Sequence, residues 1–329
     1  MKVAIITSGG DAPGINHVIQ EISSTECYET WGIHGGYDGI IKNKPFLIEN
    51  ELCKINAMSG KQIVKSGRSR NMFLQERRKE IIEKLKADKF DCLIVCGGNG
   101  SLEGAKLLSE EGINTIFIPM TVDNDIGYSE YSIGFDTALN SIIDITKQIH
   151  DTSYNMSNRI FMLEVQGGNC GMLALSAGVA GNADFIITPE SKLDYAEIAK
   201  KIKLKLKETS YILIICSETS YKKDTYTAGK QGISFEIGKY IEAETGIRVR
   251  YTIPGFYSRG NRPTYRDCYI SKLIGRECRK NIEKSKYNLL IGIKNESSFS
   301  MEYEEHKKDK KQLNQTLKDI AVEKNIILF

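Results

Sequence analysis

The sequence has few of the features that would mark a membrane, secreted or nucleic-acid-binding protein. No apolar run has the length needed to cross a bilayer, and the first residues are typical of a strand rather than a basic, apolar leader, so we expect a cytoplasmic protein without a membrane partner. The 45 Lys and Arg residues are nearly offset by 42 Asp and Glu residues. The resulting net charge of +3 is too small to select nucleic acid by itself, so any anion site must be local.

The chain also has few prolines and histidines, and no paired cysteine motif. Six prolines and the absence of a Ser-, Gly- or Pro-rich linker argue against two domains on a flexible tether, so any lobes should be interleaved. The four histidines lack metal-ligand spacing, which excludes a typical zinc site. The eight cysteines contain no CxxC pair, and several lie in apolar runs, so we expect reduced, structural thiols.

What the chain does have is a repeated alternation of short apolar runs and amphipathic stretches. The predicted strands are 3–7, 30–33, 92–96, 115–119, 160–165, 185–187, 211–216, 249–253 and 289–293. Predicted helices between them include 71–87, 101–111, 137–150, 195–208 and 231–244. Continuous apolar strands separated by helices indicate an α/β protein whose largely parallel sheets are covered on both faces, in two three-layer lobes.

Two glycine-rich turns follow predicted strands and open helices. The first is Ser8-Gly9-Gly10-Asp11-Ala12-Pro13-Gly14, and the second is Gly97-Gly98-Asn99-Gly100-Ser101. Glycine lets the backbone approach a ligand closely, and the N–H groups that open a helix attract anions. Because parallel strands end at the same edge of a sheet, the two turns predict one polyphosphate site. Neither turn has the Walker or GxGxxG pattern.

A pair of carboxylates follows the strand that ends at residue 119. Asp123 and Asp125 are separated by one residue in the segment Thr121-Val-Asp-Asn-Asp125. Two such groups can take different roles, since one can accept a proton from an attacking hydroxyl while the other holds a metal ion or its waters.

These motifs together resemble the ordered motifs of the phosphofructokinase family. The resemblance rests on residues 7–16, 97–101, 121–125, 134–138 and 259–263, and it spans nearly the whole chain. It implies a nucleotide-binding lobe of residues 1–135 plus 258–308 and a sugar-phosphate-binding lobe of 136–257 plus 309–329. It also implies ATP- and Mg²⁺-dependent phosphorylation of fructose 6-phosphate to fructose 1,6-bisphosphate in glycolysis, and a homo-oligomer, either a dimer or a tetramer.

The resemblance assigns roles to the residues around the transferred phosphoryl group. Asp123 matches the general base, Thr121 its neighbour, Arg68 the arginine along the phosphoryl group, and Asp125 the carboxylate that serves magnesium. The residues expected to line the nucleotide are Gly10, Tyr37, Arg68, Ser69, Gly98, Asn99, Gly100 and Ser101. Gly100 favours ATP over pyrophosphate, because members that use pyrophosphate carry an aspartate at that position.

The resemblance also places residues around the acceptor sugar phosphate. Arg159, Arg250 and Arg259 match positions that bind its phosphate, and Glu218 matches one that contacts sugar hydroxyls. Guanidinium groups suit this task because they form paired, charge-assisted bonds with phosphate. In the family Arg159 and Arg250 reach in from a neighbouring subunit. The other expected acceptor residues are Thr121, Asp123, Gln166, Gly167, Gly168 and Phe256.

Three departures from the family pattern fall within this site. Asn99 replaces an aspartate that supports magnesium, Gly168 replaces an arginine, and Phe256 replaces a histidine. The departures leave open two alternatives, a kinase for another sugar phosphate and a weakly catalytic subunit that binds ligands for regulation. A further departure, with Gln20, Ser24 and His150 at the family's basic effector positions, predicts no control by ADP or phosphoenolpyruvate.

Overall fold

A computed structural model describes residues 1–220, 232–306 and 310–329, which form two compact units. Unit 1 contains residues 1–122, 126–137 and 259–309, and unit 2 contains 123–125, 138–258 and 310–329. Each unit is therefore assembled from three separate stretches of chain. The predicted lobes divided the chain at nearby positions but did not place 123–125 with the second unit. Which unit takes the nucleotide and which the sugar phosphate stays a prediction.

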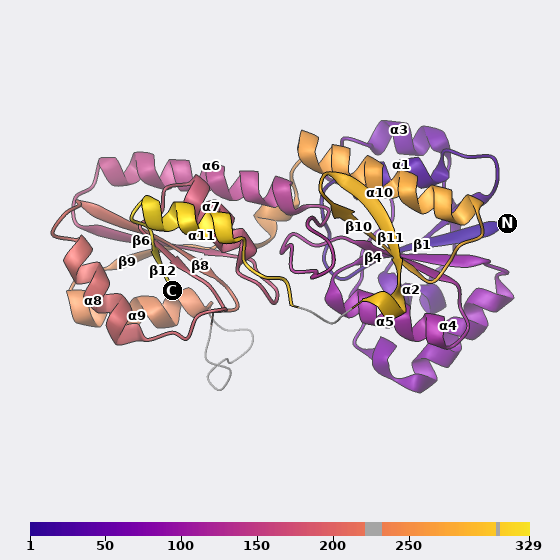
Figure 1. Ribbon diagram of the computed structural model, residues 1–329, viewed down its shortest axis with the longest axis horizontal. Helices are drawn as coiled ribbons and strands as arrows, with labels where there is room; N and C mark the ends of the chain where they lie inside the picture. The colour runs from indigo at the N-terminus through magenta and orange to yellow at the C-terminus, as the bar shows by residue number, and fades with distance from the viewer. Residues whose placement is uncertain (221–231, 307–309) are drawn as a thin grey trace. The chain divides into compact units, whose positions relative to one another are not determined.

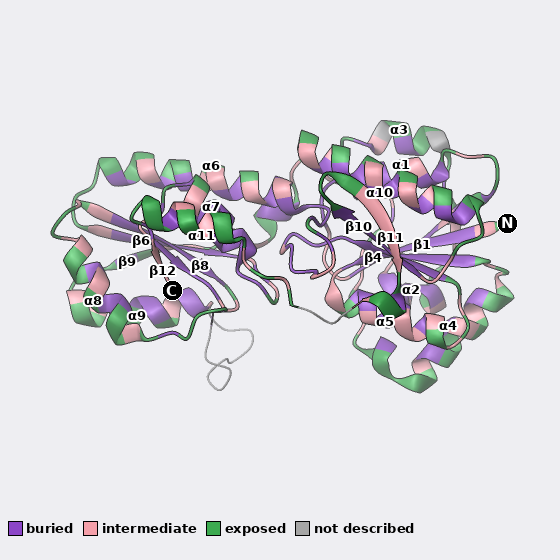
Figure 2. Ribbon diagram, viewed as in Figure 1, coloured by how far each residue is buried: buried purple, intermediate pink, exposed green. Residues whose placement is uncertain are grey.

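Unit 1 contains a seven-stranded sheet in the order β11-β10-β5-β4-β1-β2-β3. Its strands are β1 (Lys2–Ser8), β2 (Glu29–Ile33), β3 (Phe46–Leu47), β4 (Cys92–Gly97), β5 (Thr115–Pro119), β10 (Leu289–Lys294) and β11 (Ser297–Glu302). The five inner strands are parallel, and only β3 and β11 at the two edges run antiparallel to their neighbours. All of β4 is buried, which accounts for its continuous apolar sequence (Figure 2).

Helices cover both faces of this sheet. On one side lie α1 (Ile15–Ser23), α3 (Asn50–Asn56) and α10 (Tyr265–Glu283), and on the other α2 (Gly36–Lys42), α4 (Gln75–Ala87) and α5 (Asn99–Glu110) (Figure 1). Two 3₁₀ turns, Asn71–Phe73 and Tyr303–Glu305, complete this layer. The helix α6 (Phe135–Tyr154) begins in unit 1, and its residues from Ala138 onward belong to unit 2.

Unit 2 contains a five-stranded, fully parallel sheet in the order β12-β7-β8-β6-β9. Its strands are β6 (Arg159–Val165), β7 (Phe185–Ile187), β8 (Tyr211–Ser217), β9 (Val249–Thr252) and β12 (Ile327–Leu328). The helices α8 (Tyr195–Lys205) and α9 (Ile233–Thr245) cover one face, and α6, α7 (Met172–Ala180) and α11 (Gln315–Glu323) cover the other (Figure 1). A 3₁₀ turn spans Gly255–Arg259. The predicted α/β architecture with largely parallel sheets is confirmed.

The nine strands predicted from apolar runs are all present, with ends that differ by one residue at most. The sequence did not predict β3, β11 or β12, of which β3 and β12 have only two residues each. The predicted helix 71–87 divides at Leu74 into a 3₁₀ turn and α4. Residue 231, the start of another predicted helix, lies outside the described residues, and α9 begins at Ile233.

All eight cysteines are unpaired, as the sequence predicts for structural thiols. Cys92, Cys96, Cys216 and Cys278 are fully buried, and that burial raises the pKa of each thiol. Among the described residues, none of the helices combines the length and the apolar character that crossing a bilayer requires.

Candidate active site

The first glycine turn follows β1 and is held against a second loop of unit 1. Gly9 has φ of +102°, a backbone conformation that residues with a side chain rarely adopt. Its N–H group donates to the Gly67 carbonyl at 3.0 Å, so the loop that carries Arg68 and Ser69 lies beside the turn. Ser69 Oγ donates to Asp38 at 2.5 Å, and Arg68 is exposed. Two predicted nucleotide segments of unit 1, the first glycine turn and the loop with Arg68 and Ser69, therefore lie side by side.

The second glycine turn joins the first through a serine. Ser101 Oγ in the first turn of α5 donates to the Ser8 carbonyl at 3.0 Å. A Cβ atom on Gly97 would overlap that carbonyl, so the close approach of the two turns requires glycine there. Gly98 is the N-cap of α5, a helix of 12 residues, and Gly100 is exposed. The helix presents its unpaired N–H groups beside the first turn, as expected for a phosphate site.

Tyr37 contacts the start of α5, the helix that follows the second glycine turn. Its side chain is 1% exposed, and its hydroxyl donates to the Ser101 carbonyl at 2.6 Å. Burial raises the pKa of the Tyr37 hydroxyl, so it remains a proton donor. The sequence predicted that Tyr37 lines the nucleotide. Because the ring is covered by protein, its side chain can contribute only by holding the start of α5 in place.

Arg259 lies against the first glycine turn, although it was predicted as a ligand of the sugar phosphate. Its Nη1 donates to the Asp11 carbonyl at 3.1 Å, and a Cβ atom on Gly10 would overlap the guanidinium group. The side chain is 8% exposed, and its Nε has no hydrogen-bond partner among the residues that the structure describes. Unit 1 therefore holds a buried cation beside its glycine turns, where an anion would be attracted.

The segment with the paired acids leaves β5 and passes from unit 1 into unit 2. Met120 N–H donates to the Gly97 carbonyl at 2.9 Å, and the Thr121 carbonyl accepts from Ser132 Oγ at 3.0 Å. Thr121 is 9% exposed and Asp125 is 7% exposed. Asn124 between the two acids has φ of +48°, a conformation that Asn adopts more readily than most residues. The turn at Asn124 places the carboxylates of Asp123 and Asp125 within one segment of three residues.

In unit 2 the two acids meet the loop that follows β6. A Cβ atom on Gly168 would overlap Asp125 Oδ2 and lie 3.0 Å from Asp123 Oδ2. Asn169 N–H donates to Asp125 Oδ2 at 2.9 Å, and the Asn169 amide lies 3.3 Å from the same oxygen. The sequence analysis did not single out Asn169. The available signal was its place directly after the Gly167-Gly168 pair, where a residue's backbone N–H can reach a neighbouring carboxylate.

The other predicted acceptor residues of unit 2 gather at the carboxyl ends of β6 and β8. Gln166 and Gly167 follow β6, and Glu218 follows β8, where its N–H donates to the Val165 carbonyl at 2.9 Å. Gln166 Oε1 accepts from Ser258 Oγ at 3.3 Å. Glu218 is exposed. The structure thus brings these residues to the same edge of the sheet as Gly168.

Arg159 and Arg250 lie toward the other end of the same strands. Arg159 is the first residue of β6, whereas Gln166 follows the last, so about 23 Å of strand separates them at 3.3 Å per residue. Arg250 pairs with Phe161, near the start of β6, and is exposed. One chain therefore does not place these two arginines with the acceptor residues of its own unit 2. Phe256 is 77% exposed on the 3₁₀ turn before Arg259.

The residues present fit a magnesium ion that is shared with a substrate. Magnesium usually binds through one or two carboxylates, substrate phosphates and water. Asp123 Oδ2 and Asp125 Oδ2 both lie beside Gly168, so a pair of hard oxygen ligands is available. Asn99, the other predicted ligand, opens α5 in unit 1. No cluster of three or more His, Cys, Asp or Glu side chains suited to a metal ion occurs in residues 1–220, 232–306 and 310–329.

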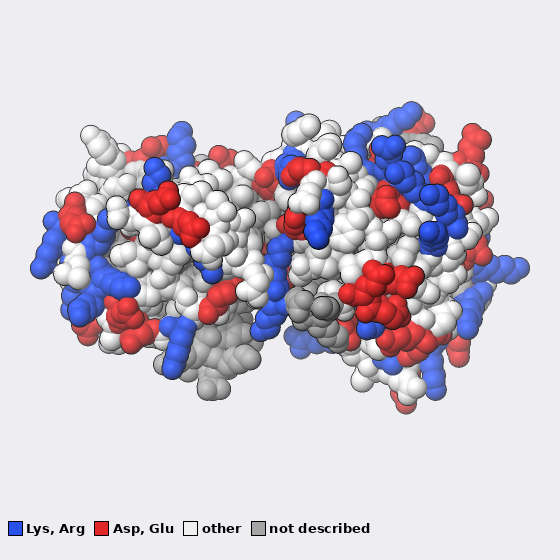
Figure 3. Space-filling model, in the orientation of Figure 1, with Lys and Arg blue, Asp and Glu red and all other residues white. Residues whose placement is uncertain are grey.

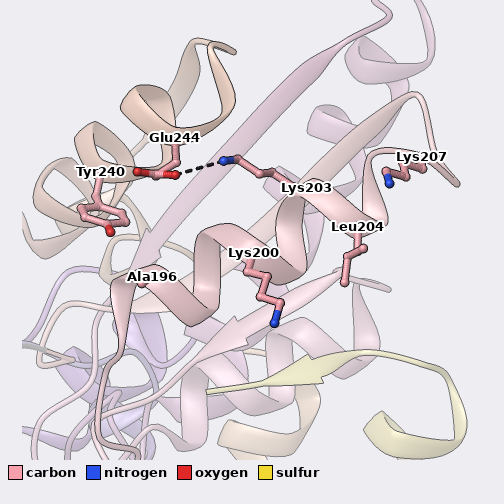
Figure 4. Close-up of a pocket in the computed structure, with 7 residues that line it drawn as sticks. All are labelled: Ala196, Lys200, Lys203, Leu204, Lys207, Tyr240 and Glu244. Carbon is pink, nitrogen blue, oxygen red and sulfur yellow. Dashed lines mark hydrogen bonds and ion pairs between the residues drawn. The ribbon is translucent and has the colours of Figure 1, made fainter.

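A pocket of about 380 Å³ lies on the surface of unit 2, away from these residues (Figure 4). It is lined by Ala196, Lys200, Lys203, Leu204, Lys207, Tyr240 and Glu244, from α8, the turn after it and α9. An ion pair of 3.0 Å joins Lys203 and Glu244 across it. None of the predicted site residues lines the pocket. On the face shown in Figure 3, acidic and basic side chains occur together on each unit, as the small net charge predicts.

His150, one of the three residues at the family's effector positions, has structural partners. Its Nδ1 lies 2.8 Å from the Tyr211 hydroxyl and its Nε2 lies 2.7 Å from the Gly181 carbonyl. The ring therefore connects α6, β8 and the end of α7. Both ring nitrogens are occupied within unit 2.

Comparison with known proteins defines the class to which this fold and site belong. A model of the phosphofructokinase family matches residues 2–282. The ATP-dependent 6-phosphofructokinase 1 of Clostridium perfringens is 35% identical over 325 residues, which cover 97% of this chain and 98% of that protein. The ATP-dependent 6-phosphofructokinase of Clostridium botulinum strain Hall is 36% identical over 323 residues, with the same coverage. The chain belongs to the phosphofructokinase family.

Solved structures agree with this assignment at the level of the fold. The T-state phosphofructokinase of Pichia pastoris aligns with a TM-score of 0.82 at 22% identity, over 92% of this chain and 37% of that one. A pyrophosphate-dependent phosphofructokinase from Nitrosospira multiformis aligns with a TM-score of 0.83 at 17% identity, over 95% of this chain and 86% of that one. A pyrophosphate-dependent enzyme thus shares the fold of a chain whose sequence relatives are ATP-dependent, so the fold alone does not choose the donor.

Proposed function

We propose that this protein transfers the terminal phosphoryl group of ATP to the 1-hydroxyl of fructose 6-phosphate, and thereby serves glycolysis as a cytoplasmic enzyme. The observation that carries the proposal is the full-length similarity to ATP-dependent 6-phosphofructokinases at 35% identity, combined with an intact Asp123 and Asp125 pair. Gly100 supports ATP as the donor, because its surroundings are open and carry no acidic side chain in the first turn of α5.

The chemistry requires positioning, charge neutralisation and a proton acceptor. Asp123 accepts the proton of the attacking 1-hydroxyl, and Thr121 helps to hold the reacting groups. Arg68 lies along the transferred phosphoryl group, while the N–H groups from Gly98 to Ser101 and at Gly10 bind the donor phosphates. Asp125, with Asn99 as a second and weaker ligand, would hold magnesium, which neutralises charge on the donor phosphates when bound.

The acceptor sugar phosphate would be bound by residues of this chain and by two arginines of a neighbouring subunit. Gln166, Gly167, Gly168 and Phe256 would surround the sugar phosphate, with Glu218 on the sugar hydroxyls, and Arg259 would contribute a cation. Arg159 and Arg250 complete the phosphate site from a neighbouring subunit of a homo-oligomer. This part of the proposal is supported by the separation of about 23 Å along β6 between Arg159 and Gln166.

A coupled assay of ADP release tests the activity. We expect saturable turnover with fructose 6-phosphate, ATP and magnesium, and turnover at least tenfold lower with other hexose and pentose phosphates. Preference for another sugar phosphate would favour the paralogous kinase, to which Gln166, Gly168 and Phe256 point. Tight binding of fructose 6-phosphate in calorimetry without ADP release would instead identify a ligand-binding subunit and overturn the proposed reaction.

Mixed oligomers test the shared acceptor site. Asp123→Asn and Arg159→Ser subunits, each inactive alone, should regain activity when unfolded and refolded together, because some sites then combine intact residues from both chains. Random dimers would recover about a quarter of the wild-type activity. No recovery, despite mixed oligomers confirmed by mass spectrometry, would place Arg159 outside the active site of its neighbour.

A further inference from the structure

The loop after β6 makes an unusually close approach to the paired acids. A Cβ atom on Gly168 would overlap Asp125 Oδ2 and lie 3.0 Å from Asp123 Oδ2, so any side chain at this position must displace a carboxylate or the loop. Gly168 does not have a positive φ, so its backbone conformation alone does not call for glycine. The close contact is with the two carboxylates. The resemblance places an arginine at this position, and here the side chain of an arginine would have to displace the Asp125 carboxylate.

The residue after this glycine holds the carboxylate that approaches it. Asn169 N–H donates to Asp125 Oδ2 at 2.9 Å, and Asn169 Nδ2 lies 3.3 Å from the same oxygen. Asp125 is 7% exposed, whereas Asn169 is exposed. Hydrogen bonds from a neutral donor to a carboxylate are stronger than those between neutral groups, so this pair restricts the rotation of the Asp125 side chain.

The loop is itself held on both sides of Gly168 and Asn169. The Gly167 carbonyl accepts from Thr219 Oγ1 at 2.6 Å, and Gly171 N–H donates to Glu190 at 2.9 Å. Cys170 between these anchors is fully buried, and burial followed by the nearby Glu190 raises the pKa of its thiol to about 12. The backbone N–H of Asn169 is therefore held in place by anchors on both sides.

We propose that Asn169 is a positioning residue that orients Asp125, and that glycine at position 168 lets the Asn169 backbone N–H reach Asp125 without displacing its carboxylate. The inference rests on the proposed function, in which Asp125 serves magnesium. Restoring the arginine should consequently impair the enzyme rather than improve it.

Two substitutions at Gly168 test the steric part of the proposal. Gly168→Ala and Gly168→Arg should lower kcat at least 100-fold, with KM for ATP within threefold of wild type. In the presence of ATP and without sugar phosphate, both should weaken Mn²⁺ binding, followed by electron paramagnetic resonance, more than tenfold. A kcat and an Mn²⁺ affinity within threefold of wild type for the arginine variant would overturn the proposal.

Substitutions at the exposed Asn169 keep the test valid if the Gly168 variants do not fold. Asn169→Ala keeps the backbone donor and should lower kcat three- to tenfold, with a higher magnesium concentration at half-maximal rate. Asn169→Asp puts a negative charge beside Asp125 and should shift that concentration further. Asn155→Ala, an exposed asparagine elsewhere in unit 2, is the matched control and should leave both quantities unchanged. Equal behaviour of Asn169→Asp and this control would contradict the positioning role.

The Mn²⁺ measurement separates this inference from the proposed function. If wild type binds Mn²⁺ with ATP but phosphorylates no sugar phosphate, the proposed reaction is wrong, and the Mn²⁺ affinities of the variants still test the positioning role of Asn169. If wild type is an active kinase and the Gly168 and Asn169 variants match it in Mn²⁺ affinity, the positioning role is wrong and the proposed reaction stands.

Discussion

Asp267 Oδ2 accepts two hydrogen bonds from Thr137, one from the backbone N–H at 2.8 Å and one from the hydroxyl at 2.5 Å. Its other oxygen accepts from Gly134 N–H at 2.9 Å. Asp267 belongs to the first turn of α10, and Thr137 to the first turn of α6, so one carboxylate with no exposed surface fixes the beginning of a second helix. Burial raises the pKa of Asp267 to about 6, against the opposing effect of its bonds to Thr137 and Gly134.

This pKa predicts a specific dependence of stability on pH. Because the folded-state pKa of about 6 lies above the ordinary value of 3.8, the unfolded chain loses its proton first as the pH rises. The contribution of Asp267 to the free energy of unfolding should therefore fall by about 3 kcal/mol between about pH 4 and pH 6. The advantage of wild type over Asp267→Asn in thermal midpoint should shrink across that interval. A constant difference from pH 4 to pH 7 would contradict the assignment.

Replacing the proposed general base should separate catalysis from binding. Asp123→Asn keeps the size of the side chain but removes its ability to accept the proton of the sugar hydroxyl, so kcat should fall about 10²- to 10⁴-fold. Calorimetry should show ATP affinity within threefold of wild type. The exposed Asp151→Asn is the control for a lost carboxylate elsewhere in unit 2. Wild-type turnover in the Asp123 variant would rule out this residue as the base.

A substitution at Tyr37 tests whether its hydroxyl holds the start of α5 or contacts the nucleotide. Tyr37→Phe removes the 2.6 Å bond to the Ser101 carbonyl while keeping the buried ring. We expect a loss of about 1 kcal/mol of stability, the usual net value of such a bond, and a KM for ATP within threefold of wild type. A loss of ATP affinity above tenfold, with little change in thermal midpoint, would show that the hydroxyl contacts the nucleotide.

The open space around Gly100 predicts opposite effects on folding and on ATP use. A Cβ atom there meets nothing within 4 Å, and the residue lies in the first turn of α5. Gly100→Asp should stabilise the protein by about 0.5 to 1 kcal/mol, because an acid suits a helix N-terminus and glycine is a poor helix former. Its kcat/KM for ATP should fall at least 100-fold, whereas Gly100→Ala should retain most activity. Undiminished ATP use by the aspartate variant would argue against the role given to this position.

The burial of the cysteines predicts which thiols react. Cys27 is exposed and Cys268 is half-buried, whereas the other six are buried. Treatment of the native protein with iodoacetamide should therefore label two thiols, and treatment after unfolding should label eight. Peptide mass spectrometry identifies the sites, and Cys27→Ser should reduce the native count to one. Rapid labelling of Cys92 or Cys96 would be incompatible with their positions in β4.

The strands were predictable because their apolar runs are continuous and buried, as in β6 and β8. The edge strand β11 was not, because its sequence Ser297-Ser-Phe-Ser-Met-Glu302 is only partly buried and lacks such a run. Pairing with β10 through the turn at Asn295 and Glu296 fixes β11 in the structure. The short β3 and β12 likewise depend on their neighbours.

The motifs of the candidate site could be located in the sequence, but the contacts between them could not. The sequence placed both glycine turns after strands, yet the bond from Ser101 to Ser8 that joins them depends on sheet order. Tyr37 was expected at the nucleotide, and the structure shows its side chain buried with its hydroxyl bonded to the Ser101 carbonyl. Gly168 was interpreted as the loss of a charged group. Only coordinates could reveal that the acids occupy the space of the missing side chain.

The division of each unit into three stretches has a consequence for how the chain acquires its structure during synthesis. Unit 1 needs β10 beside β5, and unit 2 needs β12 beside β7. A ribosome that has made the first 288 residues has therefore supplied neither sheet in full, and β5 still has an unpaired edge open to association. Both units can therefore complete their sheets only after synthesis has passed residue 288. A chain that ends before residue 289 would lack a strand of each sheet.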